Sequence, residues 1–234
     1  YTVKPLFAPF VDMYRTKRFW VWVMQLLVGL SFFALAFAIP AIDFFPLTLI
    51  VFWIMAFGSA THEIAAAGFY MLGLPEPEQS AFVGIRTAFY RLGTIATKGG
   101  VVILAGYLEM RGSSIASAWS STFFLVAALF MAFFCYHSFI LPYPVVDKAA
   151  PVSSSSRRIF EFLRILILFF KKKDIVVVPA FFLFYRFAEA QLVKMVAPFL
   201  LDPPGKGGLG LTTSEVGIVY GTVGVIALMA GGLI

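Results

Sequence analysis

The chain has 234 residues, of which 61% are hydrophobic and 13% are charged, and its formal net charge is +6. Soluble domains contain about 25% charged residues, so this composition, with a mean hydropathy of +0.92, excludes an ordinary soluble protein. The apolar residues form continuous runs of about 20 or more, long enough to cross a hydrocarbon core of about 30 Å as helices. Strands of a membrane barrel would instead alternate over about ten residues. The sequence therefore predicts an all-α membrane protein.

Six membrane-spanning helices are expected, separated by turns that are rich in Pro, Gly or charged residues. Residues 1–18 read as the end of a further, partial helix followed by a basic turn. The expected spans are, in chain order, 19–39, 47–72, 80–108, 115–141, 174–201 and a last one that starts near Thr213. Because neither Tyr1 nor Ile234 resembles a natural terminus, we expect the chain to be an internal fragment.

The basic residues between the spans set the expected orientation, because Lys and Arg are enriched in cytoplasmic loops. If every span crosses, 11 of the 18 basic residues lie on the side of residues 1–18 and 142–173, two lie on the other side and five lie inside spans. Residues 1–18 and 142–173 are therefore expected to be cytoplasmic. This clustering beside the membrane accounts for the net charge and argues against nucleic-acid binding, which needs a basic patch or stripe.

Charged residues inside the spans are the first candidates for function. Each costs about 2.5–3.5 kcal/mol at the bilayer centre on insertion scales, and such residues normally face a partner or a water-filled path. His62 and Glu63 lie in the second span among small residues, about 100° apart on the helix. Glu63, with His62 beside it, is either a proton carrier or the permanent partner of a nearby arginine.

The third span carries three basic residues. Arg91 and Lys98 are seven residues apart, on nearly the same face of an α-helix, and could attract an anionic substrate. Arg86 lies closer to the cytoplasmic end, where a long side chain can extend to the interface.

The fifth span holds a polar cluster. Arg186 and Glu189 are three residues apart and can pair on one helix face. They form either a simple ion pair or, with Gln191 and Lys194, part of a cavity lining.

Three motif-like patterns do not indicate an enzyme, a metal site or a cofactor site. His62-Glu63 begins like a zinc-protease motif, but Ala66 stands where the second histidine is needed. Residues 205–210 match G-x-G-x-x-G but follow a helix instead of a strand, which argues against nucleotide binding. Gly217 and Gly221 form a G-x-x-x-G pattern that we interpret as packing within the chain.

Several segments resemble a known transporter family. Residues 11–18 resemble the basic turn between the second and third helices of major facilitator superfamily transporters. Residues 60–70 and 82–91 resemble the AmpG-like muropeptide permeases, in the branch that includes acetyl-CoA transporters, and residues 184–191 and 197–202 resemble the seventh helix of that family. The charged residues of the basic turn are Asp12, Arg15, Lys17 and Arg18.

The resemblance implies a partial major facilitator superfamily bundle. Residues 1–141 would be the end of helix 2 and helices 3 to 6, residues 142–173 a cytoplasmic linker with an amphipathic segment, and residues 174–234 helices 7 and 8. The implied activity is proton-coupled uptake of muropeptides for cell-wall recycling, by alternating access across the bacterial inner membrane. The implied partners are the lipid bilayer, protons and a small anionic substrate, and the implied oligomeric state is a monomer.

Two positions depart from the family pattern and keep alternatives open. Ala67 stands where an acidic residue is expected, while Glu63 remains one turn earlier, and Lys98 stands where a neutral polar residue is expected. The alternatives are transport of another anionic solute, such as acetyl-CoA or an organic anion, and a non-transporting membrane sensor on the same scaffold.

Overall fold

The computed structural model describes residues 8–11, 14–148, 155–171, 175 and 177–231. Every regular element within these residues is a helix, which confirms the predicted all-α class. The elements are α2 (Lys17–Ala38), α3 (Phe44–Gly73), α4 (Glu76–Ile95), the π-helix η1 (Ala96–Val101), α5 (Val102–Met110), α6 (Ile115–Ile140), α7 (Ser155–Phe170), α8 (Val177–Leu201), the 3-10 helix η2 (Pro204–Lys206), α9 (Thr213–Val216), the π-helix η3 (Gly217–Val223) and α10 (Gly224–Gly231).

Helices cover all six of the predicted spans. Four of the described helices are long and apolar enough to cross a membrane, and they are Lys17–Ala38, Phe44–Gly73, Ile115–Ile140 and Thr213–Gly231. The other two predicted spans correspond to the continuous rod α4–η1–α5 and to α8. Both contain several charged residues, which lower their hydropathy. The same charged residues are the candidate functional residues of these spans.

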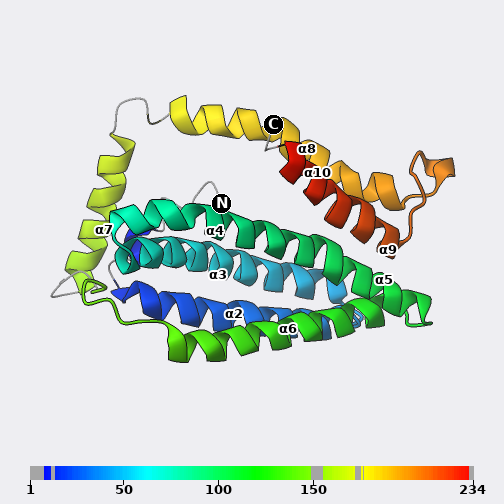
Figure 1. The fold of residues 1–234 in the computed structure, drawn as a ribbon, viewed down its shortest axis with the longest axis horizontal. Helices are drawn as coiled ribbons and strands as arrows, with labels where there is room; N and C mark the ends of the chain where they lie inside the picture. Colours follow the sequence, from blue (N-terminus) through cyan, green and yellow to red (C-terminus); the bar gives the residue numbers. More distant parts are fainter. Residues whose placement is uncertain (1–7, 12–13, 149–154, 172–174, 176, 232–234) are drawn as a thin grey trace.

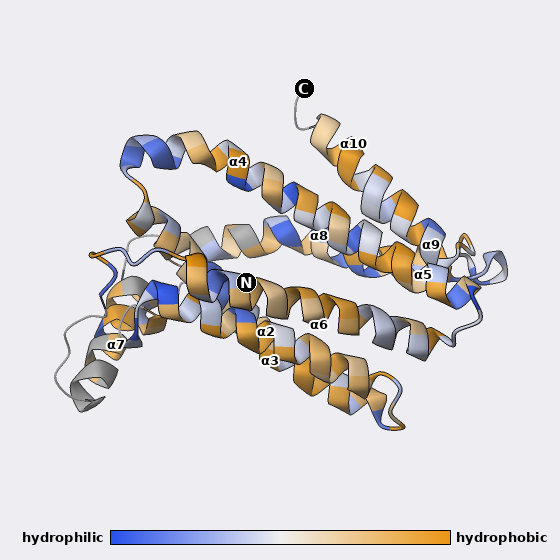
Figure 2. Cartoon of the chain, turned by 60° about the horizontal axis from the view of Figure 1, so that its bottom comes forward, coloured by the Kyte–Doolittle hydropathy of each residue, from blue (hydrophilic) through white to orange (hydrophobic). Residues whose placement is uncertain are grey.

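Helix α2 is the centre of a three-helix bundle, with α3 on one side and α6 on the other. Gly29 lets α6 approach α2 closely, since an added Cβ there would meet Phe130 and Met131. The buried Ser120 hydroxyl donates a hydrogen bond to the Ala36 carbonyl across the same interface. Close packing and polar contacts of this kind hold helices together in lipid, where burial of apolar surface adds no drive for association. Figure 2 shows that most of the ribbon of α2, α3 and α6 has the colour of hydrophobic residues.

The rod α4–η1–α5 and the segments α8 and α9–η3–α10 form a second group, because η1 contacts η3, α5 contacts α9, and α9 contacts α8. The α5 segment packs on both α6 and α9, and η1 packs on η3. The contacts of this group therefore lie toward the end that carries the α5–α6 turn. At the opposite end, which carries the start of α2 and the end of α6, helix α7 lies across the direction of the other helices (Figure 1).

Candidate functional site

A cavity of about 370 Å³ lies between α2, α3 and α6 and holds both histidines of the chain. His62 from α3 and His137 from α6 line it together with apolar and aromatic side chains. Glu63 follows His62 by one residue and lies on an exposed part of α3. The two neighbours thus face different surroundings, as their 100° separation predicts.

His137 is held in this cavity by a residue that the sequence did not single out. The buried Gln25 of α2 places its Oε1 at 2.8 Å from Nδ1 of His137, so Nδ1 donates the proton of this hydrogen bond. The two residues are 112 positions apart. A glutamine within an apolar run was the only sequence signal that pointed to this pair.

The Gln25–His137 bond gives a first prediction. Gln25→Leu leaves Nδ1 of His137 without its acceptor. It should therefore destabilise the protein more when His137 is present than when His137 has been replaced by Phe. We expect a coupling free energy of about 0.6–1.7 kcal/mol, the range for interhelical hydrogen bonds in membranes, from a double-mutant cycle on the free energy of unfolding. Thr122→Val is the control partner, because the Thr122 hydroxyl bonds to Ala118 of its own helix. Its effect should add to that of Gln25→Leu, and additivity in the Gln25–His137 cycle would contradict the prediction.

The basic residues of the α4–η1 rod lie in three different settings. The Arg86 guanidinium lies over the ring of Tyr70, 5.4 Å from its centroid, near the end of α3. Arg91 is half-buried. Lys98 lies in the π-helix η1, and its Nζ is 5.6 Å from the centroid of the Tyr220 ring. The wider turn that begins at Ala96 changes the helical register, so the seven-residue spacing of Arg91 and Lys98 does not place them as it would in an uninterrupted α-helix.

Lys98 also lines a second cavity of about 370 Å³. This cavity joins the α4–η1–α5 rod to Trp119 of α6, to the C-terminal part of α8 and to Tyr220 of η3. It is mostly apolar, and Lys98 supplies its positive charge. In a site of this kind the cation can orient the anionic group of a ligand, and the aromatic and aliphatic side chains can contact the apolar part of the same ligand.

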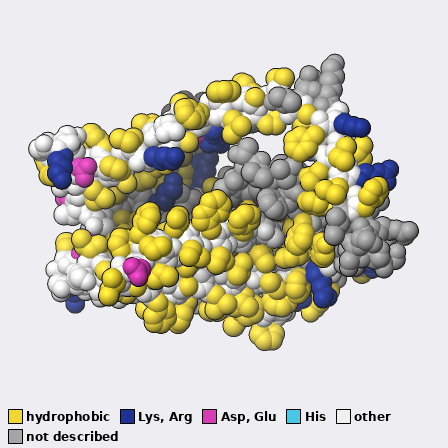
Figure 3. Space-filling model, turned by 180° about the vertical axis from the view of Figure 1, so that it is seen from behind, with side chains coloured by type: hydrophobic (Ala, Val, Ile, Leu, Met, Phe, Trp, Pro, Cys, Tyr) yellow, Lys and Arg dark blue, Asp and Glu magenta, His cyan; other side chains and the backbone are white. Residues whose placement is uncertain are grey.

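The polar cluster of α8 is exposed along the helix. Arg186 and Glu189 form an ion pair at 2.6 Å, with 69% and 57% of their side chains exposed. Gln191 and Lys194 follow on the same helix and are also exposed. Figure 3 shows the molecule hollowed between its upper helix and the three-helix bundle, with Lys and Arg side chains gathered inside the hollow.

Glycines hold η1–α5 against α9–η3. A Cβ on Gly221 would overlap the backbone of Lys98 and Gly99, and one on Gly217 would meet Ile103. The G-x-x-x-G pattern therefore serves packing within the chain, as predicted. Beyond the glycines, Thr213 donates a hydrogen bond of 2.7 Å to Glu109. Two π-helices facing one another are notable, because π-helical turns occur frequently at functional sites.

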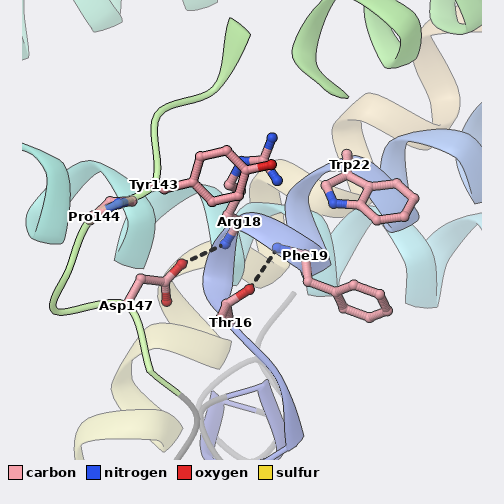
Figure 4. Close-up of a pocket in the computed structure, with 7 residues that line it drawn as sticks. All are labelled: Thr16, Arg18, Phe19, Trp22, Tyr143, Pro144 and Asp147. Carbon is pink, nitrogen blue, oxygen red and sulfur yellow. Dashed lines mark hydrogen bonds between the residues drawn. The ribbon is translucent and has the colours of Figure 1, made fainter. Parts of the chain in front are cut away.

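The basic turn forms a latch with the start of the linker (Figure 4). Asp147 is buried and accepts hydrogen bonds from the backbone N–H groups of Lys17, at 2.8 Å, and Arg18, at 2.9 Å. The Arg18 side chain donates to the carbonyls of Leu141 and Ser138 at 3.0 and 2.9 Å. A carboxylate thus caps the N-terminus of α2 and a guanidinium caps the C-terminus of α6, and each charge is favourable at that helix end.

Residues of this latch line a cavity of about 240 Å³ together with aromatic side chains. The Arg18 guanidinium stacks over the ring of Tyr143, 3.7 Å from its centroid. Thr16 caps α2 with its own hydroxyl, which accepts a hydrogen bond from the Phe19 N–H. Arg15 lies 5.4 Å from the centroid of the Phe19 ring. Asp12, the remaining residue predicted for this turn, lies outside the described residues.

Residues 205–210, which match a nucleotide-binding pattern, form the turn between α8 and α9. Gly207 and Gly210 have φ values of +83° and +68°, a region that favours glycine. The segment follows a helix and contains a short 3-10 turn, so the glycines are explained by the backbone of the turn.

Comparison with known proteins gives matches along the whole chain. The chain is 24% identical over 238 residues to the anhydromuropeptide permease of Escherichia coli K12, a match that covers 100% of the chain and 45% of the relative. The resemblance to AmpG-like permeases is confirmed. The chain is also 23% identical over 242 residues to the transporter AmpG 4 of Rickettsia felis, covering 99% of the chain and 55% of the relative. A third relative, the transporter AmpG 3 of Rickettsia prowazekii, is 22% identical over 254 residues, covering 99% of the chain and 55% of its own length.

The chain thus spans about half the length of these AmpG-like relatives. No family model and no solved structure matches it. The relatives are named as transporters and permeases, in agreement with the expectation that the chain is not an enzyme. Together with the apolar helices, they support a multi-pass membrane protein.

Proposed function

We propose that the complete protein is a membrane transporter that takes up muropeptides into the cytosol, coupled to protons, across a bacterial inner membrane. The observation that carries this proposal is the similarity to the anhydromuropeptide permease of Escherichia coli over the whole chain. The residues add support, because Arg91 and Lys98 on one rod and Lys194 on α8 supply positive charge for an anionic substrate.

Alternating access is the proposed mechanism. In this mechanism two helical halves rock about a central site. The α4–η1–α5 rod belongs to the proposed first half, residues 1–141, and α8 to α10 belong to the proposed second half, residues 174–234. These parts touch through the η1–η3 glycines toward one end, while the hollow of Figure 3 lies beside them. Such an arrangement suits a state closed at the end of the α5–α6 turn and open at the end of the proposed cytoplasmic linker, residues 142–173.

Glu63 is the proposed proton carrier. Glu63→Gln cannot release or bind a proton, so this variant of the complete protein should lose proton-driven uptake. The assay is uptake of radiolabelled anhydro-muropeptide in a permease-null bacterial strain, with and without a protonophore. Protonophore-sensitive uptake by the unchanged protein supports the proposal, and absence of uptake by protein shown to be in the membrane would point to another anionic solute.

Glu78→Gln is the matched control for this experiment. Glu78 lies exposed in the first turn of α4, at the loop after α3, and the same substitution there should leave uptake unchanged. If Glu63→Gln transports as well as the control across pH, Glu63 does not carry the proton, and His62 becomes the next residue to replace.

A further inference from the structure

The linker helix α7 carries an exposed apolar stripe. Phe160, Leu163, Ile167 and Phe170 are 67%, 49%, 54% and 59% exposed. They are spaced three or four residues apart, so all four lie on one face of the helix. Helix α7 is 16 residues long, which is too short to cross a membrane, because a spanning helix needs about 20 apolar residues.

Basic residues border this stripe. Arg164 directly follows Leu163, and Lys171 directly follows Phe170, and both are exposed. Arg164 is four residues after Phe160 and Lys171 is four residues after Ile167, so each cation lies about 40° around the helix from a residue of the stripe, at its edge. In the sequence, Arg157 and Arg158 stand at the start of the helix, and Lys172 and Lys173 follow Lys171. An apolar face with Lys and Arg beside it is typical of helices that lie in the membrane interface and bind anionic lipids.

The placement of α7 fits the same role. It runs across the direction of the other helices, at the end where α2 begins and α6 ends (Figure 1). If the other helices cross the bilayer, a helix in this position lies along the membrane surface. The latch fixes the start of the linker at that end, because Asp147 is bonded to the first turn of α2.

We propose that α7 is a lipid-binding helix that inserts its apolar stripe at the headgroup boundary and holds the phosphates of anionic lipids with Arg164 and Lys171. This inference rests on the multi-pass arrangement of the helices and is independent of the proposed substrate. Because the linker connects α6 to α8, lipid charge at one leaflet would act on the position of the proposed second half relative to the proposed first half.

Spin labels on the complete protein test the proposal. Nitroxides are attached to single cysteines at Leu163 and at Arg164, in a background with Cys135 and any other cysteine replaced, and the protein is placed in nanodiscs. Both leaflets of a nanodisc have the same composition, so the result does not depend on orientation. The Leu163 label should be accessible to oxygen and protected from a water-soluble nickel complex, whereas the Arg164 label should be accessible to the nickel complex.

The charge dependence is measured by comparing nanodiscs of phosphatidylcholine with nanodiscs that contain one quarter phosphatidylglycerol. Arg164→Gln/Lys171→Gln should reduce the ratio of membrane-bound to water-exposed label at Leu163 by roughly thirtyfold in the anionic nanodiscs, from the attraction of two basic residues to an anionic leaflet. Arg111→Gln/Lys206→Gln removes two charges from loops at the other end and should leave the ratio unchanged.

Three outcomes would overturn the proposal. If the label at Leu163 is accessible to the nickel complex in both lipids, α7 does not lie in the interface. If the label at Leu163 is protected from both oxygen and the nickel complex, the stripe packs on protein. An unchanged ratio on adding phosphatidylglycerol would show that α7 lies in the interface without binding anionic lipid, which also contradicts the proposal.

Discussion

Gly221→Ala is expected to lower the midpoint of thermal unfolding of the complete protein, although alanine normally stabilises a helix. An added Cβ at Gly221 would overlap the backbone carbonyl of Lys98, and backbone cannot move aside as a flexible side chain can. Overpacking of this kind costs about 1–3 kcal/mol, and each kcal/mol lowers the midpoint by about 2–4 °C in a chain of about 150–250 residues and by less in a longer one. The measurement is the thermal midpoint of the purified protein in detergent.

Gly100→Ala is the matched control, because Gly100 lies in the facing π-helix with open space around its Cα. There the lower entropy of the unfolded chain should raise the midpoint or leave it unchanged. The same chemical change is therefore expected to lower the midpoint at Gly221 and not to lower it at Gly100. Equal midpoints for Gly221→Ala and Gly100→Ala would show that the close approach of η1 and η3 is not needed.

Asp147→Ala is expected to destabilise the latch between the linker and α2. The N–H groups of Lys17 and Arg18 lose their charged acceptor, and removal of a capping side chain costs about 0.5–2 kcal/mol. Asp147→Asn keeps one acceptor oxygen but removes the favourable charge at the helix N-terminus, so its loss should be intermediate. Unfolding of each variant is measured by the same thermal assay.

Asp43→Ala provides the comparison for the latch. Asp43 is the N-cap residue of α3 and makes no side-chain capping bond there. Its replacement should change stability by less than half of the Asp147→Ala effect. An equal loss for both variants would mean that any aspartate before a helix has this effect, and that the reciprocal capping by Asp147 and Arg18 is not important.

The helices themselves could be predicted from the sequence, because each apolar run ends at residues that cannot continue in lipid. The predicted span 115–141 agrees with Ile115–Ile140 of α6, which is bounded by Ser114 and Pro142. The internal role of Gly217 and Gly221 was also predictable, since small residues at that spacing permit close approach.

The contacts that assemble the site could not be predicted in the same way. Gln25 and His137 are 112 residues apart, and Arg18 bonds to Asp147 across 129 residues. Neither spacing is periodic, so only the packing of α2 on α6 brings these residues together. The π-helix η1 likewise shifts the register of Lys98 by a change in backbone hydrogen bonding that the apolar pattern does not reveal.

The one-sided attachment of α8 has a mechanical consequence. The residues of α8 that line the second cavity with Lys98 and Tyr220 are confined to its last third, Val193–Leu201. At 1.5 Å per residue the helix is about 37 Å long. Because its packed residues lie near one end, α8 would rotate about that fulcrum as a rigid rod. A rotation of about 10° at that fulcrum displaces the far end by roughly 6 Å, about the height of one helical turn. A small rotation at the packed end of α8 would thereby be amplified at its other end.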